Sequence, residues 1–188
     1  ENIIREVPKK FDISKIYLVD YDTQAGGLGR QKPKASADLL DQINRGTLLV
    51  NFFGHGDPNT WAHEQVLVKA RDLPLIQNGI KLPLWVAATC TWGQYDAPNI
   101  PSSAEEMVWS PDGGGIMSIA ASRPSFAFEN ERFAEDMFNN LFNNRDGSRR
   151  SLLVGDAVVR SVGGRDNDQK YHIFGDVTLN LADPQHVV

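Results

Sequence analysis

Short apolar runs alternate along this chain with segments in which apolar residues recur at helical spacing. Strands are predicted where the apolar runs lie, at 15–20, 47–53, 82–88, 116–121 and 171–174. Helices are predicted at 35–44, around 64–70, at 129–142 and at 151–162. Strands separated by helices form parallel βαβ units. We therefore expect an α/β fold, a three-layer sandwich with a mostly parallel central sheet and helices on both faces.

Details of the pattern refine this expectation. The runs 47–53 and 82–88 are almost continuously apolar, which is typical of strands buried on both faces. The polar, glycine-rich stretch 23–33 is predicted to be a loop, and glycines 113–115 introduce the strand at 116–121. Turn clusters at 143–147 and 163–166 end the last two predicted helices.

Two of the predicted strands end in turns that carry reactive side chains. The strand 47–53 runs into Gly54-His55-Gly56-Asp57, and the strand 82–88 runs into Thr89-Cys90. In parallel sheets the functional groups gather where the strands end, at one edge. A thiol beside an imidazole is the minimum for nucleophilic catalysis, because the histidine takes the proton of the attacking sulfur. The sequence therefore predicts a catalytic pair of His55 and Cys90.

The residues around this pair suggest further roles. Gly54 and Gly56 allow a sharp turn and a close approach of backbone to substrate. The N–H groups of Gly56 and Cys90 are candidate oxyanion donors, worth about 3–4 kcal/mol in a transition state. The candidates for lining a substrate cleft are Trp61, Trp92, Asp57 and Glu105. For the two tryptophans core packing is the alternative, and Ser102 to Glu105 also has the pattern of a helix start.

Each half of the pair also has a purely structural interpretation. A histidine between two glycines is also found as a cap on a turn, and a single cysteine is often a small buried apolar residue. The placement of both at strand ends, 35 positions apart with one crossover between them, favours catalysis.

Composition narrows the classes of function. The chain has 188 residues, of which 41% are hydrophobic and 23% charged, enough for one domain with a real core. A net charge of −5 with scattered basic residues argues against a nucleic-acid partner. One cysteine allows no internal disulfide, so cysteine usage does not indicate a compartment. No stretch approaches the roughly 20 apolar residues of a transmembrane helix.

No metal or organic cofactor is expected. His55, Asp57, His63 and Glu64 fit no standard ligand spacing, and residues 26–29 lack the pattern of a nucleotide-binding loop. Whether a structural calcium ion stabilises loops such as 163–168 is left open by the sequence.

Several sequence blocks, in order, resemble those of gingipain-type cysteine peptidases, and most closely those of the PorU-type sortase of the type IX secretion system. The blocks span most of the chain: Asn51 to Gly56, Trp61-Ala62 with Glu64 and Leu67, Ala88 to Asp96, Ser103 to Glu105, Gly114 to Ile116, Ser122-Arg123, Asn130, and Phe174 to Leu181. Two departures from the sortase pattern, Val177-Thr178 in place of Pro-Ala and Ala104 in place of Gly, leave His55 and Cys90 untouched.

The resemblance implies a caspase-like fold and peptide-bond cleavage by a Cys–His dyad. It implies that residues 1–188 form one lobe, the second, dyad-bearing half of a gingipain-type catalytic domain, with the upstream half absent from this chain. It further implies removal of C-terminal sorting-signal domains from secreted cargo, with transfer of the acyl-enzyme to an amine of cell-surface lipopolysaccharide. The implied partners are peptide substrates, secretion-system subunits and lipopolysaccharide, at the surface of a Gram-negative bacterium or outside it.

Two alternatives remain at this point. One is a secreted gingipain-like protease that only hydrolyses its substrates. The other is a non-catalytic binding or scaffold domain of the same fold, in which His55 and Cys90 lie too far apart to interact.

Overall fold

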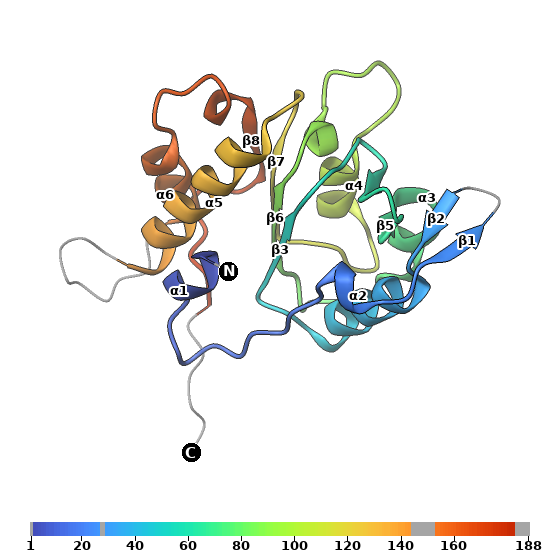
Figure 1. The fold of residues 1–188 in the computed structure, drawn as a ribbon. Coiled ribbons are helices and arrows are strands. Elements are labelled where there is room, and N and C mark those ends of the chain that lie inside the picture. Colours follow the sequence, from blue (N-terminus) through green and yellow to red (C-terminus); the bar gives the residue numbers. More distant parts are fainter. Residues whose placement is uncertain (1, 27–28, 144–152, 183–188) are drawn as a thin grey trace.

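A four-stranded sheet forms the centre of the molecule (Figure 1). The computed structural model describes residues 2–26, 29–143 and 153–182. The sheet has the order β3-β6-β7-β8, in which the first three strands are parallel and the last is antiparallel to its neighbour. The strands are β3 (Leu49–Phe53), β6 (Leu84–Ala88), β7 (Met117–Ala121) and β8 (Tyr171–Gly175). The expected mostly parallel sheet is confirmed.

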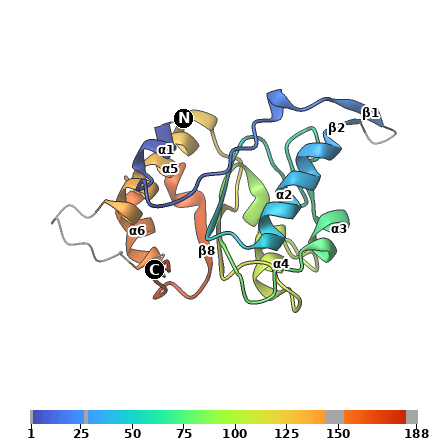
Figure 2. The same ribbon diagram turned by 90° about the horizontal axis from the view of Figure 1, so that it is seen from below.

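Helices cover both faces of this sheet, which makes the expected three layers (Figures 1 and 2). On one face lie α1 (Asn2–Glu6), α5 (Ala127–Phe142) and α6 (Val154–Ser161). On the other lie α2 (Pro33–Arg45), α3 (Lys69–Asp72) and α4 (Ser103–Trp109). The predicted helices 35–44 and 129–142 are confirmed. That at 151–162 is confirmed from Val154, while residues 151–152 and the turn residues 144–147 lie outside the described parts.

Strand β6 joins the two halves of the core. All five of its residues are buried, and their side chains alternate between the faces as a pleated strand requires. Leu84 and Val86 pack with the side chains of α5 and α6, whereas Trp85 and Ala87 pack in a second cluster with residues of α2 and α4. Because both faces of β6 are packed, the position of the residues that follow Ala88 is well defined.

Strand β3 differs from its prediction because it lies at the edge of the sheet. Val50 and Phe52 pack into the second cluster, but Asn51 and Phe53 are exposed, Phe53 to 46%. Burial on both faces is therefore correct for β6 and wrong for β3.

Three shorter segments also differ from their predictions. Residues 15–20 form no strand: they end in a single 3-10 turn and leave Val19 89% exposed, since no other described strand lies beside them. The predicted loop 23–33 contains a small hairpin of β1 (Gln24–Gly26) and β2 (Gly29–Gln31). The helix expected around 64–70 starts only at Lys69, because a hairpin of β4 (Thr60–Trp61) and β5 (Leu67–Val68) precedes it.

Candidate active site

The ends of β3 and β6 bring the two reactive residues to one edge of the sheet. The strands are neighbours, and their register pairs Phe53 with Ala88, the last residue of each. Gly54 N donates to Ala88 O at 3.5 Å, which extends the pairing one residue further. His55 and Cys90 each lie two residues beyond this last pair. The topology expected from the sequence is therefore present.

Gly56 lies directly against the turn that carries Cys90. A side chain at position 56 would put its Cβ 2.6 Å from Thr89 Oγ1 and 3.0 Å from Thr89 Cγ2, so the close approach needs a glycine. Gly56 also forms an antiparallel bridge with Trp61, in which the flanking pairs His55–Ala62 and Asp57–Thr60 carry the hydrogen bonds. In such a pair the central N–H points outward, and within the described residues it meets no acceptor.

His55 is exposed and lies over a second imidazole. Its carbonyl accepts from Ala62 N at 2.8 Å, and its ring stacks on His63 with the centroids 4.9 Å apart and the planes 11° apart. Asp57, a predicted substrate-cleft residue, is exposed, and its Oδ1 accepts from Asn59 N at 2.7 Å in a local turn.

Cys90 is half-buried, and its side chain contacts the loop that follows β7. Its thiol donates to Ser125 O at 3.5 Å, while Ser125 Oγ donates to Thr89 O at 2.9 Å. Asn130 Nδ2 donates to Ser125 Oγ, and Asn167 Nδ2 donates to Asn130 Oδ1, both at 2.9 Å. No role for Ser125 or Asn167 was predicted from the sequence. The one available signal was Asn130, a polar residue on the buried face of α5.

Three candidates for a substrate cleft are used for other purposes. Trp61 and Trp92 are each 1% exposed, and Trp61 stacks on Phe52 with the centroids 4.4 Å apart. Neither ring reaches solvent, so packing, the alternative weighed for both, is what the structure contains. Glu105 caps α4, because its Oε2 accepts from both the N and the Oγ of Ser102 at 2.7 Å.

A charged cluster lies farther along the same edge. Arg123 donates to both carboxylate oxygens of Asp96, at 2.9 and 2.5 Å, and this hydrogen bonding lowers the pKa of Asp96. Burial, and then the charge of Arg123, lowers the pKa of His172 on β8. Burial also raises the pKa of Tyr171, and the ionised form of Cys90 raises it further, which keeps this hydroxyl neutral beside the thiol.

The residues of the described chain do not form a metal site. No group of three or more His, Cys, Asp or Glu side chains in 2–26, 29–143 and 153–182 is arranged to hold an ion. In the loop 163–168, Asp168 Oδ2 accepts from Arg165 Nε at 2.7 Å and from Gly163 N at 2.9 Å. Within the described residues, this carboxylate oxygen is thus bound by Arg165 and by the backbone of Gly163.

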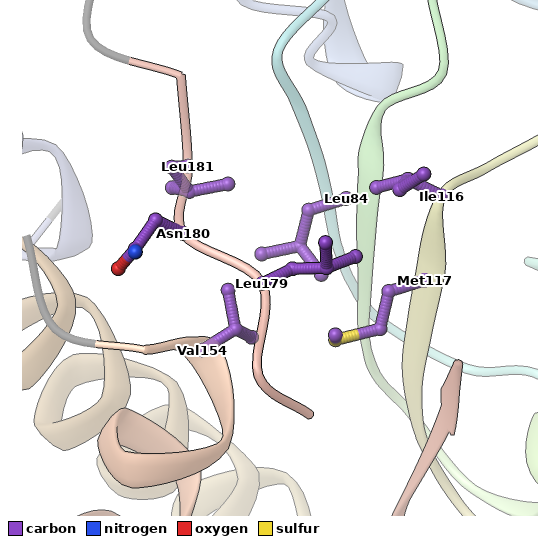
Figure 3. Close-up of a pocket in the computed structure, with 7 residues that line it drawn as sticks. All are labelled: Leu84, Ile116, Met117, Val154, Leu179, Asn180 and Leu181. Atoms are coloured by element: carbon purple, nitrogen blue, oxygen red, sulfur yellow. The ribbon is translucent and has the colours of Figure 1, made fainter. Parts of the chain in front are cut away.

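Figure 3 shows a small apolar cavity, which lies beside the first residues of β6 and β7, whereas Cys90 follows the last residue of β6. It has a volume of about 60 Å³ and lies beside Leu84 and Met117, the first residues of β6 and β7. Leu179 and Leu181 of the C-terminal segment close it. It therefore does not belong to the strand-end site. In the described part of the chain, no helix combines the length and the apolar character that crossing a membrane requires.

Comparison with known proteins points to one family. The family model described as Peptidase family C25 matches residues 1–182. Among solved structures, "Crystal structure of the Arg specific cysteine proteinase gingipain R (RGPB)" matches with a TM-score of 0.67 at 20% identity, over 78% of this chain and 36% of that one. "Complex of Porphyromonas gingivalis RgpB pro- and mature domains" matches with a TM-score of 0.65 at 18% identity, over 78% and 37%.

These likenesses show the caspase-like gingipain fold. The chain thus spans little more than a third of the length of those structures. No curated protein sequence matches the chain significantly.

Proposed function

Since this chain belongs to peptidase family C25, we propose that it carries the Cys–His dyad of a cysteine endopeptidase, with Cys90 as nucleophile and His55 as general base. The observation that carries the proposal is the pairing of β3 with β6, which ends both strands at one edge. The close approach of Gly56 to Thr89 supports it further, since it joins the two strand-end loops. We also propose that residues 1–188 correspond to the second, dyad-bearing half of a gingipain-type catalytic domain.

The reaction begins with transfer of the Cys90 proton to His55. The thiolate attacks the scissile carbonyl carbon and forms a C–S bond, while the N–H groups of Gly56 and Cys90 donate to the developing oxyanion. His55 then gives its proton to the leaving amine as the peptide bond breaks. His55 then takes a proton from the second nucleophile, water or an amine, which attacks the acyl carbon as the C–S bond breaks. The protonated His55 returns this proton to the Cys90 thiolate, which restores the starting state.

The residues around the dyad supply its rigid support. The carbonyl oxygen of Ser125 accepts a hydrogen bond from the Cys90 thiol, and the Ser125 hydroxyl donates to Thr89 O. Ser103 of α4 donates to Pro58 O from both its N and its Oγ, at 2.9 and 2.7 Å, which holds the loop after His55. Both strand-end loops are thus fixed by side chains other than the dyad itself, as preorganised catalysis requires.

The sequence blocks that resemble those of the type IX secretion-system sortase support a more specific proposal for the substrate. We propose removal of C-terminal sorting-signal domains from secreted cargo, with the acyl group passed to an amine of cell-surface lipopolysaccharide. Secretion-system subunits would then be partners, and the site of action would be the surface of a Gram-negative bacterium or its exterior. The arginine specificity named for gingipain R is a property of that protein.

Product analysis tests both levels of the proposal in the full-length protein. Cys90→Ala is expected to abolish cargo cleavage while leaving the fold intact, and unchanged cleavage would refute the peptidase. In the wild type, mass spectrometry of the new C-terminus separates the two outcomes. A bond to an amine supports sorting, whereas a free carboxylate indicates a gingipain-like protease that only hydrolyses.

A further inference from the structure

A second imidazole lies against the proposed general base. The rings of His55 and His63 are nearly parallel, with centroids 4.9 Å apart and planes 11° apart, an offset stack that aromatic pairs favour. Within the described residues, neither nitrogen of the His55 ring takes part in a hydrogen bond or an ion pair. Within the described residues, the stack on His63 is therefore the directional contact of the His55 ring.

The turn that carries His63 has an unusual backbone. Ala62 has φ of 61° and Gln65 has φ of 54°, so two non-glycine residues of the same turn lie in the left-handed region. Such residues persist where the surrounding structure holds them in place. One of the holding contacts comes from His55 itself, whose carbonyl accepts from Ala62 N at 2.8 Å.

Strand β2 and the start of α2 brace the turn from its other side. Lys32 N donates to Glu64 O at 3.2 Å, and Gln31 Nε2 donates to Gln65 Oε1 at 3.2 Å. Arg30 also forms an ion pair with Glu64 at 3.5 Å. Contacts from three consecutive residues thus fix the two positions that follow His63, although His63 itself is exposed and packs in no core cluster.

We propose that His63 is a positioning residue for the reaction: its ring restricts the rotation of His55 and so keeps the imidazole in one orientation. This inference rests on the proposed function, in which His55 serves Cys90. A general base is efficient when its ring is held in the orientation that reaches the proton it abstracts, and in many hydrolases a hydrogen-bonded side chain holds it there. Here a stacked ring performs the same task through its flat face.

The test compares two substitutions in the full-length protein. His63→Ala removes the ring, whereas His63→Phe keeps a flat ring without ionisable nitrogens. The measured quantity is the second-order rate constant for alkylation of Cys90 by iodoacetamide at pH 7, followed by mass spectrometry of the peptide that contains Cys90. We expect His63→Ala to lower this rate constant about tenfold or more, because loss of orientation is costly in catalysis. We expect His63→Phe to restore most of it.

Two results would overturn the inference. A rate constant for His63→Ala equal to that of the wild type would show that the stack has no role. An equal decrease of the rate constant in His63→Ala and His63→Phe would show that His63 does not act through ring stacking. The thermal midpoint of each variant checks that the fold is unchanged, as expected for an exposed side chain.

The same assay separates this inference from the proposed function. If His55→Ala leaves the alkylation of Cys90 unchanged, the dyad itself is wrong. If His55→Ala slows alkylation and His63→Ala does not, the dyad stands and only the role of His63 is refuted.

Discussion

Because Gly56 has no side chain, the loop after β3 can lie directly against Thr89 in the loop after β6. Thr89 is fully buried, so its side chain has no room to move away from a new Cβ. The glycine pattern around His55 was visible in the sequence and correctly indicated a close approach. The group that approaches Gly56 could not be predicted: a substrate was expected there, whereas the nearest atoms belong to Thr89. Pattern alone gives the conformational freedom of a glycine and not its neighbour.

Gly56→Ala is expected to force the two loops apart. Overpacking of this kind costs about 1–3 kcal/mol of stability, and we expect the rate of Cys90 alkylation to fall with it. Gly26→Ala is the matched control, since its Cβ would lie at an ordinary 3.4 Å from Gln31 Cδ. Thr89→Ala combined with Gly56→Ala should recover part of the loss, because the methyl and hydroxyl in the way are gone. A double variant as impaired as Gly56→Ala would show that Thr89 is not the obstacle.

His172 makes the stability of the fold depend on pH. Its pKa in the folded state lies below the ordinary value of 6.5, through burial and the charge of Arg123. The unfolded chain therefore takes up a proton first as the pH falls. The contribution of neutral His172 is complete above about pH 6.5 and is lost as the pH falls through the folded-state pKa.

His172→Gln is expected to flatten this dependence. Denaturant midpoints measured from pH 8 to pH 4.5 should fall less steeply below pH 6.5 in the variant than in the wild type. If the midpoints of the wild type and of His172→Gln fall equally steeply below pH 6.5, His172 is not the source of this pH dependence. The pKa of Asp96 is itself lowered by its hydrogen bonds to Arg123, so protonation of Asp96 belongs to a more acidic range than that of His172.

At the scale of elements, the predicted secondary structure is correct where a segment buries the residues that its own sequence pattern makes apolar. The helices at 35–44 and 129–142 and the strand at 82–88 were correct, because each buries the face that its sequence makes apolar. The predicted secondary structure is wrong where the conformation of a segment depends on another segment beside it. Residues 15–20 have the composition of a strand, but a strand also needs a neighbour to bond to. The segment 64–70 forms a turn, the short strand β5 and only the start of α3, and Gln65 of this turn, which is in the left-handed region, accepts a hydrogen bond from Gln31 of β2.

The start of α4 is an element-scale feature that stabilises the site. Ser102 and Glu105 form a reciprocal cap, and the next residue, Ser103, holds Pro58 in the loop after His55. Ser102→Ala is therefore expected to lower the free energy of unfolding by about 1 kcal/mol. Ser110→Ala, at the other end of the same helix, is the control and should have a small effect. Chemical denaturation measures both, and equal effects of the two substitutions would contradict the role of the cap.

For the whole molecule, the fold class could be predicted because strands that alternate with helices indicate parallel βαβ units. The candidate site could be predicted because parallel neighbouring strands end at one edge. What could not be predicted are the contacts made across the fold by loops distant in sequence. Ser125 lies 35 residues after Cys90, and Asn167 lies 37 residues after Asn130, so no local pattern joins either pair. The stack of His55 on His63 likewise depends on a backbone conformation that composition does not reveal.

The central claim is that His55 activates Cys90, and one comparison of rates tests it most directly. Iodoacetamide reacts with the thiolate, so its rate at pH 7 reports how readily Cys90 loses its proton. In the full-length protein we predict that Cys90 is alkylated about tenfold faster or more than in His55→Ala. Equal rates in the two proteins would contradict the account.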